Sequence, residues 1–364
     1  MTSRERILAA LRRQVPDHVP CVPDLWEMVP VRLTGRPAWE IIVTEDIPIW
    51  KVRMDAYRHF GCDALFALSI PSEVETRAIV HRDAEKVIVR EFTETPTGLC
   101  WSEYATVVFE KPPCAFVRAS SIGLPDSHDE WEPVHRRWPT TGRAYYEEAL
   151  AYVGDGGIVA PMVNIPGIPV FEQAMLRYAD EPAVIEEEMR QNGEEMLRQA
   201  EIYFSWKPDV LMIGNSGLLI SNPPPVFRTL GLEWMRRLTR RARERGVLTH
   251  MHCCGPERAL VEIAAQETDL DGIEPLECPP MGDCDLAEVK RSFGRKLALK
   301  GNLHTTDIML RAGPREVEDA CKAAIDAAGE GGGFILSTGD QTPRDVSDQT
   351  MRTMVRVAET YGKY

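Results

Sequence analysis

Short apolar segments alternate with helix-like segments over most of the chain, from residue 156 onward. The apolar segments cover residues 157–164, 209–216, 247–254, 272–277, 297–303 and 333–340. The helix-like segments between them cover residues 182–204, 225–245, 256–265, 285–293 and 314–328, and several open with a proline or an aspartate, as helix starts prefer. Apolar strands that alternate with helices predict a parallel sheet covered on both faces.

Two further strands are predicted upstream, at residues 19–26 and 64–69, with a helix at residues 47–60 between them. Eight strands close a (β/α)8 TIM barrel, so we predict a single domain of this kind over residues 1–364. The segment that begins at Thr2 predicts a capped N-terminal helix before the barrel. The rival fold, a doubly wound open sheet, favours a glycine-rich dinucleotide loop after an early strand, and this sequence has none.

One segment interrupts the alternation after the second strand. Residues 86–116 contain two stretches of alternating apolar and polar residues, which the turn Thr95-Pro96-Thr97-Gly98 separates. This pattern predicts an antiparallel hairpin. Residues 125–141 are rich in Trp, His, Pro and Asp and are predicted to form a loop, so the whole insertion spans residues 71–141.

Charge and cysteine content restrict the kind of partner and the compartment. The chain has 42 basic and 56 acidic residues and a formal charge of −14, which argues against a basic nucleic-acid groove. The arginine-rich run at residues 236–243 is interpreted as the solvated face of an amphipathic helix. Nine scattered cysteines, with no signal-peptide pattern and no membrane-spanning apolar run, lead us to expect a cytoplasmic protein with reduced thiols and no membrane partner.

The segment 246–255 carries soft metal ligands at the end of a predicted strand. Because successive side chains of a strand alternate in direction, His250, His252 and Cys254 point to one face and Cys253 to the other. An imidazole and a thiolate two residues apart form half of a tetrahedral zinc site. The alternative interpretation is that the thiols are inert apolar groups and the histidines are satisfied core residues.

More polar residues stand at the ends of the predicted strands, where TIM barrels carry their chemistry. These ends include Asp24, Trp26, Glu27, Ser69, Asn164, Asn215, Ser216, Glu274, Glu277, Cys278, Asn302, His304, Asp340 and Gln341. Catalytic zinc has three protein ligands and one open position, so Glu277, Cys278 or Asp340 could complete the site. Ser69, Ser216 and Asn302 are at least as well explained as helix caps or loop partners.

With these residues in view, the chain resembles the uroporphyrinogen decarboxylase superfamily over nearly its whole length. The resemblance is carried by His252-Cys253-Cys254-Gly255, by residues 272–277, by Gly301-Asn302-Leu303 and by residues 332–337 followed by Thr342-Pro343. Within that superfamily the chain is most similar to the zinc-dependent methyltransferases that move methyl groups to or from a corrinoid protein. The His-x-Cys-Gly strand exit is the more specific feature, and the glycine-containing pieces mainly mark the fold.

Two departures narrow what the resemblance implies. True uroporphyrinogen decarboxylases have an N-terminal Arg-Gln-Ala-Gly-Arg segment that grips the porphyrinogen carboxylates, whereas residues 25–32 here are acidic and apolar, so porphyrin decarboxylation is not expected. The coenzyme M methyltransferases have a cysteine ligand in a Pro-Gly-Cys-Gly context, and the matching stretch here is Thr338-Gly339-Asp340-Gln341. Asp340 would replace that thiolate with a harder ligand, which leaves the metal more electrophilic and argues against coenzyme M.

The resemblance then implies a cobalamin-linked methyltransferase of the O-demethylase type. Zinc held by His252, Cys254 and Asp340 would act as a Lewis acid on a methoxylated small molecule, and the methyl group would pass to the corrinoid of a partner protein. Glu277 would protonate the leaving group. The predicted substrate contacts are Trp26, Met28 and Met162 as apolar walls, and Asn164, Asn215 and Gln341 as polar contacts.

Two other functions stay open. A metal-free decarboxylase acting on a non-porphyrin acid would need an arginine or lysine beside a carboxylate at the barrel mouth, and Arg32, Arg36 and Lys300 are the nearby options. A non-catalytic binding scaffold would have its strand-end polar residues plugged by loops. Members of this superfamily are often dimers, so a homodimer is one assembly to expect.

Overall fold

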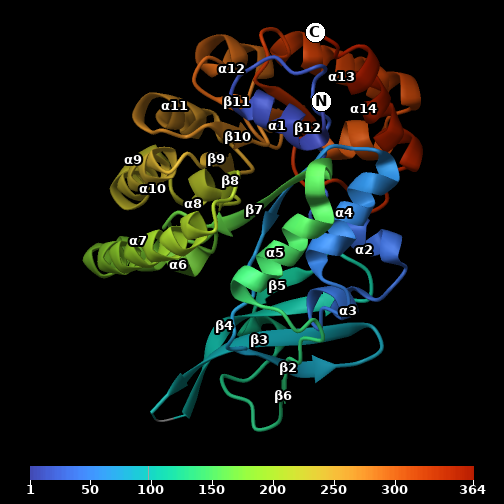
Figure 1. The fold of residues 1–364 in the computed structure, drawn as a ribbon. Coiled ribbons are helices and arrows are strands. Elements are labelled where there is room, and N and C mark those ends of the chain that lie inside the picture. The colour runs from blue at the N-terminus through green and yellow to red at the C-terminus, as the bar shows by residue number, and fades with distance from the viewer. Residues whose placement is uncertain (97) are drawn as a thin grey trace. The chain divides into compact units, whose positions relative to one another are not determined.

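The chain forms two compact units in the computed structural model, which describes residues 1–96 and 98–364. The barrel unit combines Met1–Asp24, Phe60–Ser69 and Val153–Tyr364. The inserted unit combines Leu25–His59 and Ile70–Tyr152. Figure 1 labels the helices and strands of both units.

The barrel unit contains a parallel sheet of seven strands in the order β1-β7-β8-β9-β10-β11-β12. The strands are β1 Ala64–Leu68, β7 Gly157–Val163, β8 Val210–Gly214, β9 Leu248–His252, β10 Gly272–Glu274, β11 Ala298–Leu303 and β12 Phe334–Thr338. Every residue of β1, β10 and β12 is buried, as expected for strands covered on both faces. All seven lie within segments that the sequence predicts as strands.

Residues 19–22 fill the eighth position of the barrel. Cys21 forms a parallel bridge with Leu336 of β12, and the Leu336 amide donates to the Pro20 carbonyl at 2.9 Å. On the other side, the Asp63 amide, just before β1, donates to the Cys21 carbonyl at 3.0 Å. The unit is therefore an α/β fold of the TIM-barrel type, as the sequence predicts.

Helices accompany these strands. They are α1 Ser3–Leu11, α6 Glu172–Asp180, α7 Pro182–Ser205, α8 Leu218–Ser221, α9 Pro224–Leu230, α10 Leu232–Glu244, α11 Arg258–Glu267, α12 Leu286–Phe293, α13 Pro314–Ala328 and α14 Asp348–Thr360, with the short helices η2 Gly154–Gly156 and η3 Thr305–Arg311. Of these, α1, α7, α9, α11, α12 and α13 begin at or within two residues of the predicted helix starts. The N-terminal helix is capped as expected, because the Thr2 hydroxyl accepts from the Glu5 amide at 3.2 Å.

Two predictions about these elements need correction. The sequence predicts a full strand over residues 19–26, but the structure has only the bridge described above, because Pro20 and Pro23 have no amide hydrogen for a ladder. The sequence also predicts one helix over residues 225–245, but α9 ends and α10 begins at Gly231.

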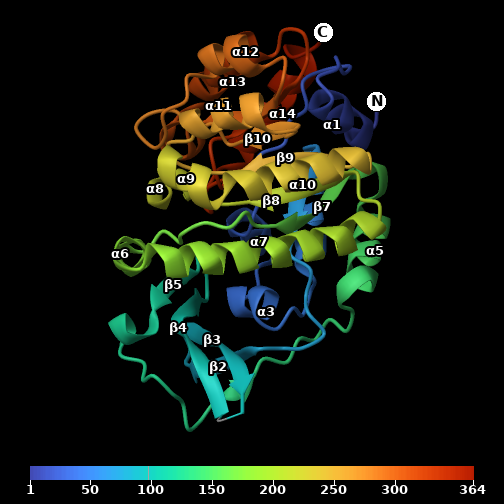
Figure 2. The ribbon, with the colours of Figure 1, turned by 90° about the vertical axis from the view of Figure 1, so that its left-hand side faces the viewer.

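Helices α7 and α10 lie side by side (Figure 2), and their close contact requires a glycine at position 193. A Cβ added at Gly193 would lie within 2.5 Å of three ring atoms of Trp234. Real Cβ atoms do not come so close, so this glycine is required by helix contact.

The inserted unit is built on a five-stranded antiparallel sheet in the order β5-β4-β3-β2-β6. Its elements are α2 Met28–Thr34, α3 Ala38–Ile42, α4 Ile49–Phe60, β2 Arg77–Arg82, β3 Lys86–Thr95, β4 Gly98–Phe109, β5 Ala115–Arg118, η1 Ala119–Ile122, β6 Glu132–Pro133 and α5 Gly142–Val153. The predicted hairpin is confirmed as β3 and β4, although residue 97 of its predicted turn lies outside the described residues. Strands β2, β5 and β6 are not predicted by the sequence.

Both faces of this sheet carry buried apolar residues. Val87 and Val89 belong to a cluster that also contains buried residues of α2, α3 and α4. On the opposite face, Ile88 and Val107 pack with Ala119 of η1. The alternation of side chains along β3 and β4 therefore serves two small cores.

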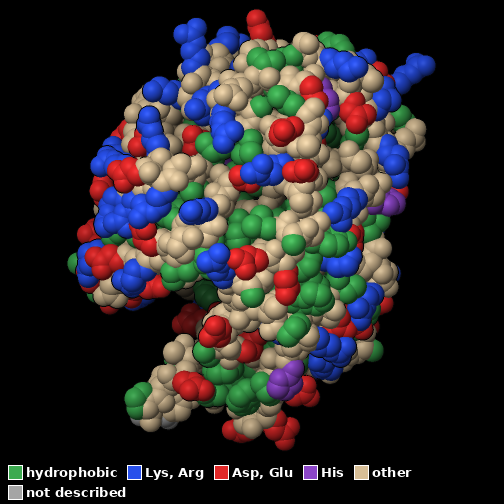
Figure 3. All heavy atoms as spheres, viewed as in Figure 1, with side chains coloured by type: hydrophobic (Ala, Val, Ile, Leu, Met, Phe, Trp, Pro, Cys, Tyr) green, Lys and Arg blue, Asp and Glu red, His purple; other side chains and the backbone are tan. Residues whose placement is uncertain are grey.

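Basic and acidic side chains are interspersed on the face of the molecule shown in Figure 3. The arginine-rich helix α10 follows this pattern, since Arg243 pairs with Asp269 at 2.6 Å and Arg241 with Glu201 at 3.3 Å. Its buried side chains include Trp234, Leu238 and Ala242. The arginine run is thus the solvated face of an amphipathic helix, as predicted. Among residues 1–96 and 98–364, no helix combines the length and apolar character needed to cross a bilayer.

Candidate metal centre

The carboxyl ends of neighbouring strands bring polar side chains together in the barrel unit. Gly214, His252 and Glu274 are paired across β8, β9 and β10. Cys254 follows His252 by two residues, and Asp340 follows the end of β12 by two residues. These are the strand ends at which TIM barrels hold their active sites.

One group of side chains has the composition of a zinc site. One ligand atom each of His252, Cys254 and Asp340 lies within 4.8 Å of the others, and His252 Nε2 is 3.8 Å from Asp340 Oδ1. Ligand atoms around a tetrahedral zinc ion lie about 3.3–3.8 Å apart, given bonds of about 2.0–2.3 Å. The imidazole and the carboxylate lie at this spacing, and a thiol within 4.8 Å of both completes a donor set that suits zinc. Within the described ranges, Glu277 and Cys278 belong to no such group of three.

A second group shares His252 with the first. Asp24, His252 and Glu274 also place one ligand atom each within 4.8 Å of the others. Asp24 follows the segment that closes the barrel, and its amide donates to the Thr338 hydroxyl at 3.0 Å. Burial raises the pKa of Asp24, although Lys300 and His252 act in the opposite direction.

Glu274 is buried and makes three polar contacts inside the barrel. Its Oε1 lies 3.1 Å from His252 Nδ1, and its Oε2 lies 2.9 Å from His250 Nε2 and 2.5 Å from Lys300 Nζ. Burial by itself raises the pKa of Glu274, but Lys300 and the two histidines overcome it, and the pKa stays well below its usual range. The carboxylate is therefore charged and available as an acceptor.

The contact with Glu274 selects the orientation of His252. An anionic carboxylate at Nδ1 requires a hydrogen on that nitrogen, which leaves Nε2 facing Asp340 and free to bind a metal. Burial lowers the pKa of His252, but the contacts with Cys254 and Glu274 raise it more, so the net pKa lies well above the ordinary value. A metal ion would displace a proton from this imidazole on binding.

Asp340 is held in a backbone conformation that side chains rarely adopt. Its φ is 145°, in a region that is normally occupied by glycine. Strain of this kind costs about 1–3 kcal/mol and is concentrated at functional sites. The strained backbone points to a role for this carboxylate beyond folding.

Replacing Asp340 by glycine is expected to stabilise the metal-free protein by about 1 kcal/mol, because relief of strain exceeds the entropy cost of glycine. The same change removes a ligand and weakens zinc binding. Urea unfolding in the presence of a chelator and a zinc titration measure the two effects. Asp345→Gly is the matched control, since Asp345 has no positive φ and should lose stability. A destabilised Asp340→Gly protein would contradict the strain interpretation.

Glu277 lies against the loop that carries Cys254. Its Oε2 accepts a hydrogen bond from the Gly255 amide at 2.5 Å, and the side chain is buried. Burial raises the pKa of this carboxyl, and the negative charge of Asp340 adds to the shift. Glu277 is thus a carboxyl that retains a proton to higher pH than an exposed glutamate does.

The predicted substrate contacts fall in different places. A Cβ added at Gly214 would lie 2.8 Å from Met162 Sδ and 3.0 Å from Asn164 Oδ1, so these two side chains lie together above β8, next to His252. The Asn215 side chain hydrogen-bonds both the amide and the carbonyl of Ile165 at 2.8 Å. The remaining predicted contacts are Gln341, which follows Asp340 in the barrel unit, and Trp26 and Met28, which belong to the inserted unit.

Three polar residues near the strand ends, Asp24, Glu257 and Glu274, were assigned no role from the sequence. Lys300 was considered only as a possible partner for a substrate carboxylate. Glu257 is fully buried, its Oε1 accepts from the Leu276 amide, and burial holds its pKa well above the usual value. A charged residue inside an apolar strand is a signal of pairing, and Glu274 and Lys300 both carry that signal. Glu257 lies next to a helix start and offers no such signal.

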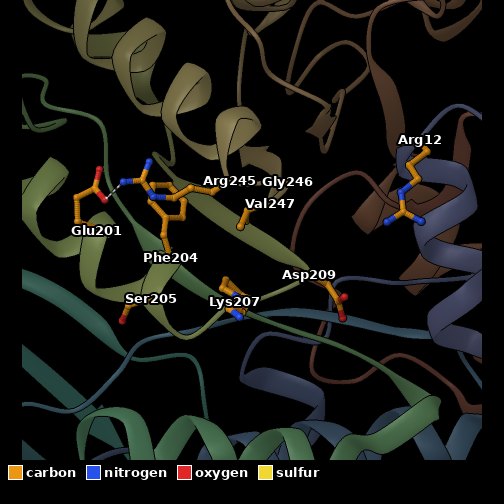
Figure 4. Close-up of a pocket in the computed structure, with 10 residues that line it drawn as sticks. Arg12, Glu201, Phe204, Ser205, Lys207, Asp209, Arg245, Gly246 and Val247 are labelled. Atoms are coloured by element: carbon orange, nitrogen blue, oxygen red, sulfur yellow. Dashed lines mark hydrogen bonds and ion pairs between the residues drawn. The ribbon is translucent and has the colours of Figure 1, made fainter.

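A hollow of about 520 Å³ lies at the opposite, amino ends of β8 and β9 (Figure 4). It is lined by residues that include Arg12, Lys207 and Asp209. Arg245 in its wall pairs with Glu201 at 2.5 Å, so part of its charge is satisfied internally. The hollow is remote from the metal-ligand group, which lies at the carboxyl strand ends.

Comparison with known proteins identifies relatives of the chain. The sequence model of the family "Uroporphyrinogen decarboxylase (URO-D)" matches residues 160–361, more than half of the chain. The uroporphyrinogen decarboxylase of Shewanella piezotolerans is 24% identical over 265 residues, which cover 70% of this chain and 72% of that protein. The enzyme of Actinobacillus pleuropneumoniae serotype 5b is 29% identical over 97 residues. That match spans 26% of this chain and only about a quarter (27%) of the relative.

A solved structure is similar along the whole chain. A methyltransferase from Methanosarcina mazei superposes with a TM-score of 0.68, covers 99% of this chain and 99% of its own, and is 14% identical in sequence. At this level of identity the similarity establishes the fold.

Proposed function

Because this chain belongs to the uroporphyrinogen decarboxylase (URO-D) family, we propose that it is a zinc-dependent methyltransferase of the O-demethylase type within that family. It transfers a methyl group between a methoxylated small molecule and a corrinoid protein. The observation that carries the proposal is the approach of His252, Cys254 and Asp340 to within 4.8 Å of one another. The fold shared with a methyltransferase from Methanosarcina mazei supports it.

His252 Nε2, Cys254 Sγ and the Asp340 carboxylate are the ligands we assign to zinc. Three protein ligands leave one position open, as in catalytic zinc sites. When bound there, zinc supplies Lewis acidity toward the ether oxygen of the substrate. Glu274 keeps the imidazole of His252 in the orientation that presents Nε2.

Glu277 provides the proton that the reaction requires. A corrinoid on a partner protein would supply the methyl acceptor, and Glu277 would give its carboxyl proton to the oxygen from which the methyl group departs. Burial favours the protonated form of this residue, and its hydrogen bond from Gly255 fixes it beside the loop of Cys254.

Met162 and Asn164 bind the substrate on the β7 side of the centre, one as an apolar wall and the other as a hydrogen-bonding partner. Their shared position above Gly214, next to His252 in the sheet, supports this assignment. Gln341, which follows Asp340 in the barrel unit, is a further proposed substrate contact, and Asn215 supports the loop at Ile165. A homodimer is one assembly that we propose.

A metal-free decarboxylase acting on a non-porphyrin acid is the second candidate. It is supported by Lys300, which lies 2.5 Å from a carboxylate inside the barrel. Lys300 is almost fully buried and already bound to Glu274, so it has little capacity to hold a substrate carboxylate as well.

The experiment that separates the two functions combines metal analysis with a transfer assay. The purified protein is analysed for zinc and then incubated with a methoxyphenol and a reduced corrinoid protein. We expect stoichiometric zinc, loss of methyl transfer after chelation, and recovery when zinc is added back. Absence of zinc after gentle purification would overturn the proposal. Decarboxylation of an organic acid that persists in chelator would favour the second candidate.

A further inference from the structure

A buried ion pair contacts His252 of the candidate metal centre through one of its members, Glu274. Lys300 Nζ on β11 is 2.5 Å from Glu274 Oε2 on β10, and the two side chains are 3% and 6% exposed. Charges buried to this extent are costly, and removal of one partner leaves the other uncompensated. Hydrophobic residues of similar size would fill the same space without that cost, so the pair calls for a role other than packing.

The two oxygens of Glu274 are used differently. Oε2 contacts Lys300 Nζ and His250 Nε2, and Oε1 contacts His252 Nδ1. Since Lys300 and His250 hold Oε2, the carboxylate cannot rotate without breaking a buried ionic contact. Oε1 therefore stays in place opposite Nδ1 of the proposed ligand.

The charges around the centre also support a role for Lys300 in holding Glu274. Cys254, Asp340 and Glu274 each contribute one negative charge when ionised, and Glu274 does not bind the metal directly in the assigned ligand set. Lys300 is the group that lies against Glu274 and offsets this extra charge in the barrel interior. Without Lys300, Oε2 would lose the buried ionic contact that holds the carboxylate in place opposite His252.

We propose that Lys300 is a positioning residue for the metal centre: acting through Glu274, it fixes His252 so that Nε2 faces the ion. This inference rests on the proposed metal site. It predicts that the effect of Lys300 on metal affinity passes entirely through the Glu274 carboxylate. Partners of this kind, one step removed from the ligands, typically change metal affinity by about 10–100-fold.

A double-mutant cycle tests the inference on the full-length protein. The variants are Lys300→Met, Glu274→Gln and the combination of both, and the readouts are the zinc dissociation constant, measured by chelator competition, and the visible spectrum of the Co²⁺-substituted protein. We expect each single change to weaken zinc binding about 10–100-fold. The double variant should bind zinc no more weakly than Glu274→Gln alone, because Lys300 has no further route to the metal.

The matched control is Lys290→Met on α12. Lys290 is also partly buried and hydrogen-bonded, to the Gly332 carbonyl at 2.5 Å, but it does not contact Glu274. Its removal should leave zinc affinity and the Co²⁺ spectrum unchanged. If Lys300→Met does not fold, Lys300→Ala takes its place in the cycle, since alanine also removes the contact with Oε2.

Two results would overturn the inference. One is a Lys300 variant that folds and binds zinc as tightly as the unmodified protein. The other is strictly additive losses in the cycle, which would show that Lys300 acts independently of Glu274. An unmodified protein that binds no zinc is a different outcome, because it overturns the proposed function itself.

Discussion

Replacing Cys254 by alanine is expected to reduce bound zinc to background and to abolish methyl transfer. Structural zinc sites with four ligands have binding free energies of about 10–16 kcal/mol, so loss of one ligand should weaken binding on the order of 10²–10³-fold. His252→Ala should have a similar effect. Zinc content by mass spectrometry and competition with a chelator measure the loss.

The neighbouring residue provides the control for this prediction. Cys253 is buried, its Sγ contacts the Cys254 carbonyl at 3.9 Å, and it does not belong to the group of ligand atoms around His252. Cys253→Ala should therefore cost some stability and keep its zinc. Retention of zinc by Cys254→Ala, or loss of zinc from Cys253→Ala, would contradict the ligand assignment.

Replacing Glu277 by glutamine is expected to lower kcat for methyl transfer about 10²–10⁴-fold while leaving zinc content unchanged. Glutamine retains the acceptor for the Gly255 amide but has no proton to give. In the unmodified protein, kcat should fall as pH rises through the pKa of Glu277. Because burial raises that pKa, the decline should come at higher pH than for an exposed glutamate, and the variant should lack it.

Glu262→Gln, on the exposed face of α11, is the control and should behave like the unmodified protein. Loss of zinc from Glu277→Gln would identify Glu277 as a ligand in place of Asp340. An unchanged pH profile in Glu277→Gln would assign the proton transfer to another group. Asp24 is then the residue to examine, since burial raises its pKa as well.

The parallel strands were predictable because they are buried on both faces. Strand β12 reads as Phe334-Ile335-Leu336-Ser337-Thr338, a nearly continuous apolar run, and helices of ordinary length separate it from its neighbours. Closure by residues 19–22 was less predictable, since one of its two pairings depends on Leu336, more than 300 residues away in the sequence. Prolines in that segment limit it to a bridge.

The antiparallel sheet of the inserted unit was only partly predictable. Strands β3 and β4 are adjacent in sequence and alternate clearly, so the hairpin follows from local pattern. Strand β6 has two residues, Glu132 and Pro133, and pairs with Ala78 and Ile79. Such a short strand has no periodicity of its own and exists only because its partner is in place.

The candidate site also contains some residues that the sequence predicts and others whose contacts only the tertiary structure determines. His252 and Cys254 follow from strand alternation, and Asp340 from the family resemblance. Glu274 and Lys300 are each visible as charged residues in buried strands, but their contact is set by the register of β10 against β11 and not by their spacing in sequence. Pairing of that kind is decided by tertiary structure.

Closure of the barrel by residues 19–22 has a consequence for synthesis. Cys21 leaves the ribosome long before its bridge partner Leu336 is translated, so the first segment of the barrel cannot pair with the last strand until then. During that interval the apolar segment is exposed. Both edge strands of the incomplete sheet have unpaired backbone groups that can pair with other chains. A nascent chain of this kind is a natural client for chaperones until β12 has been made.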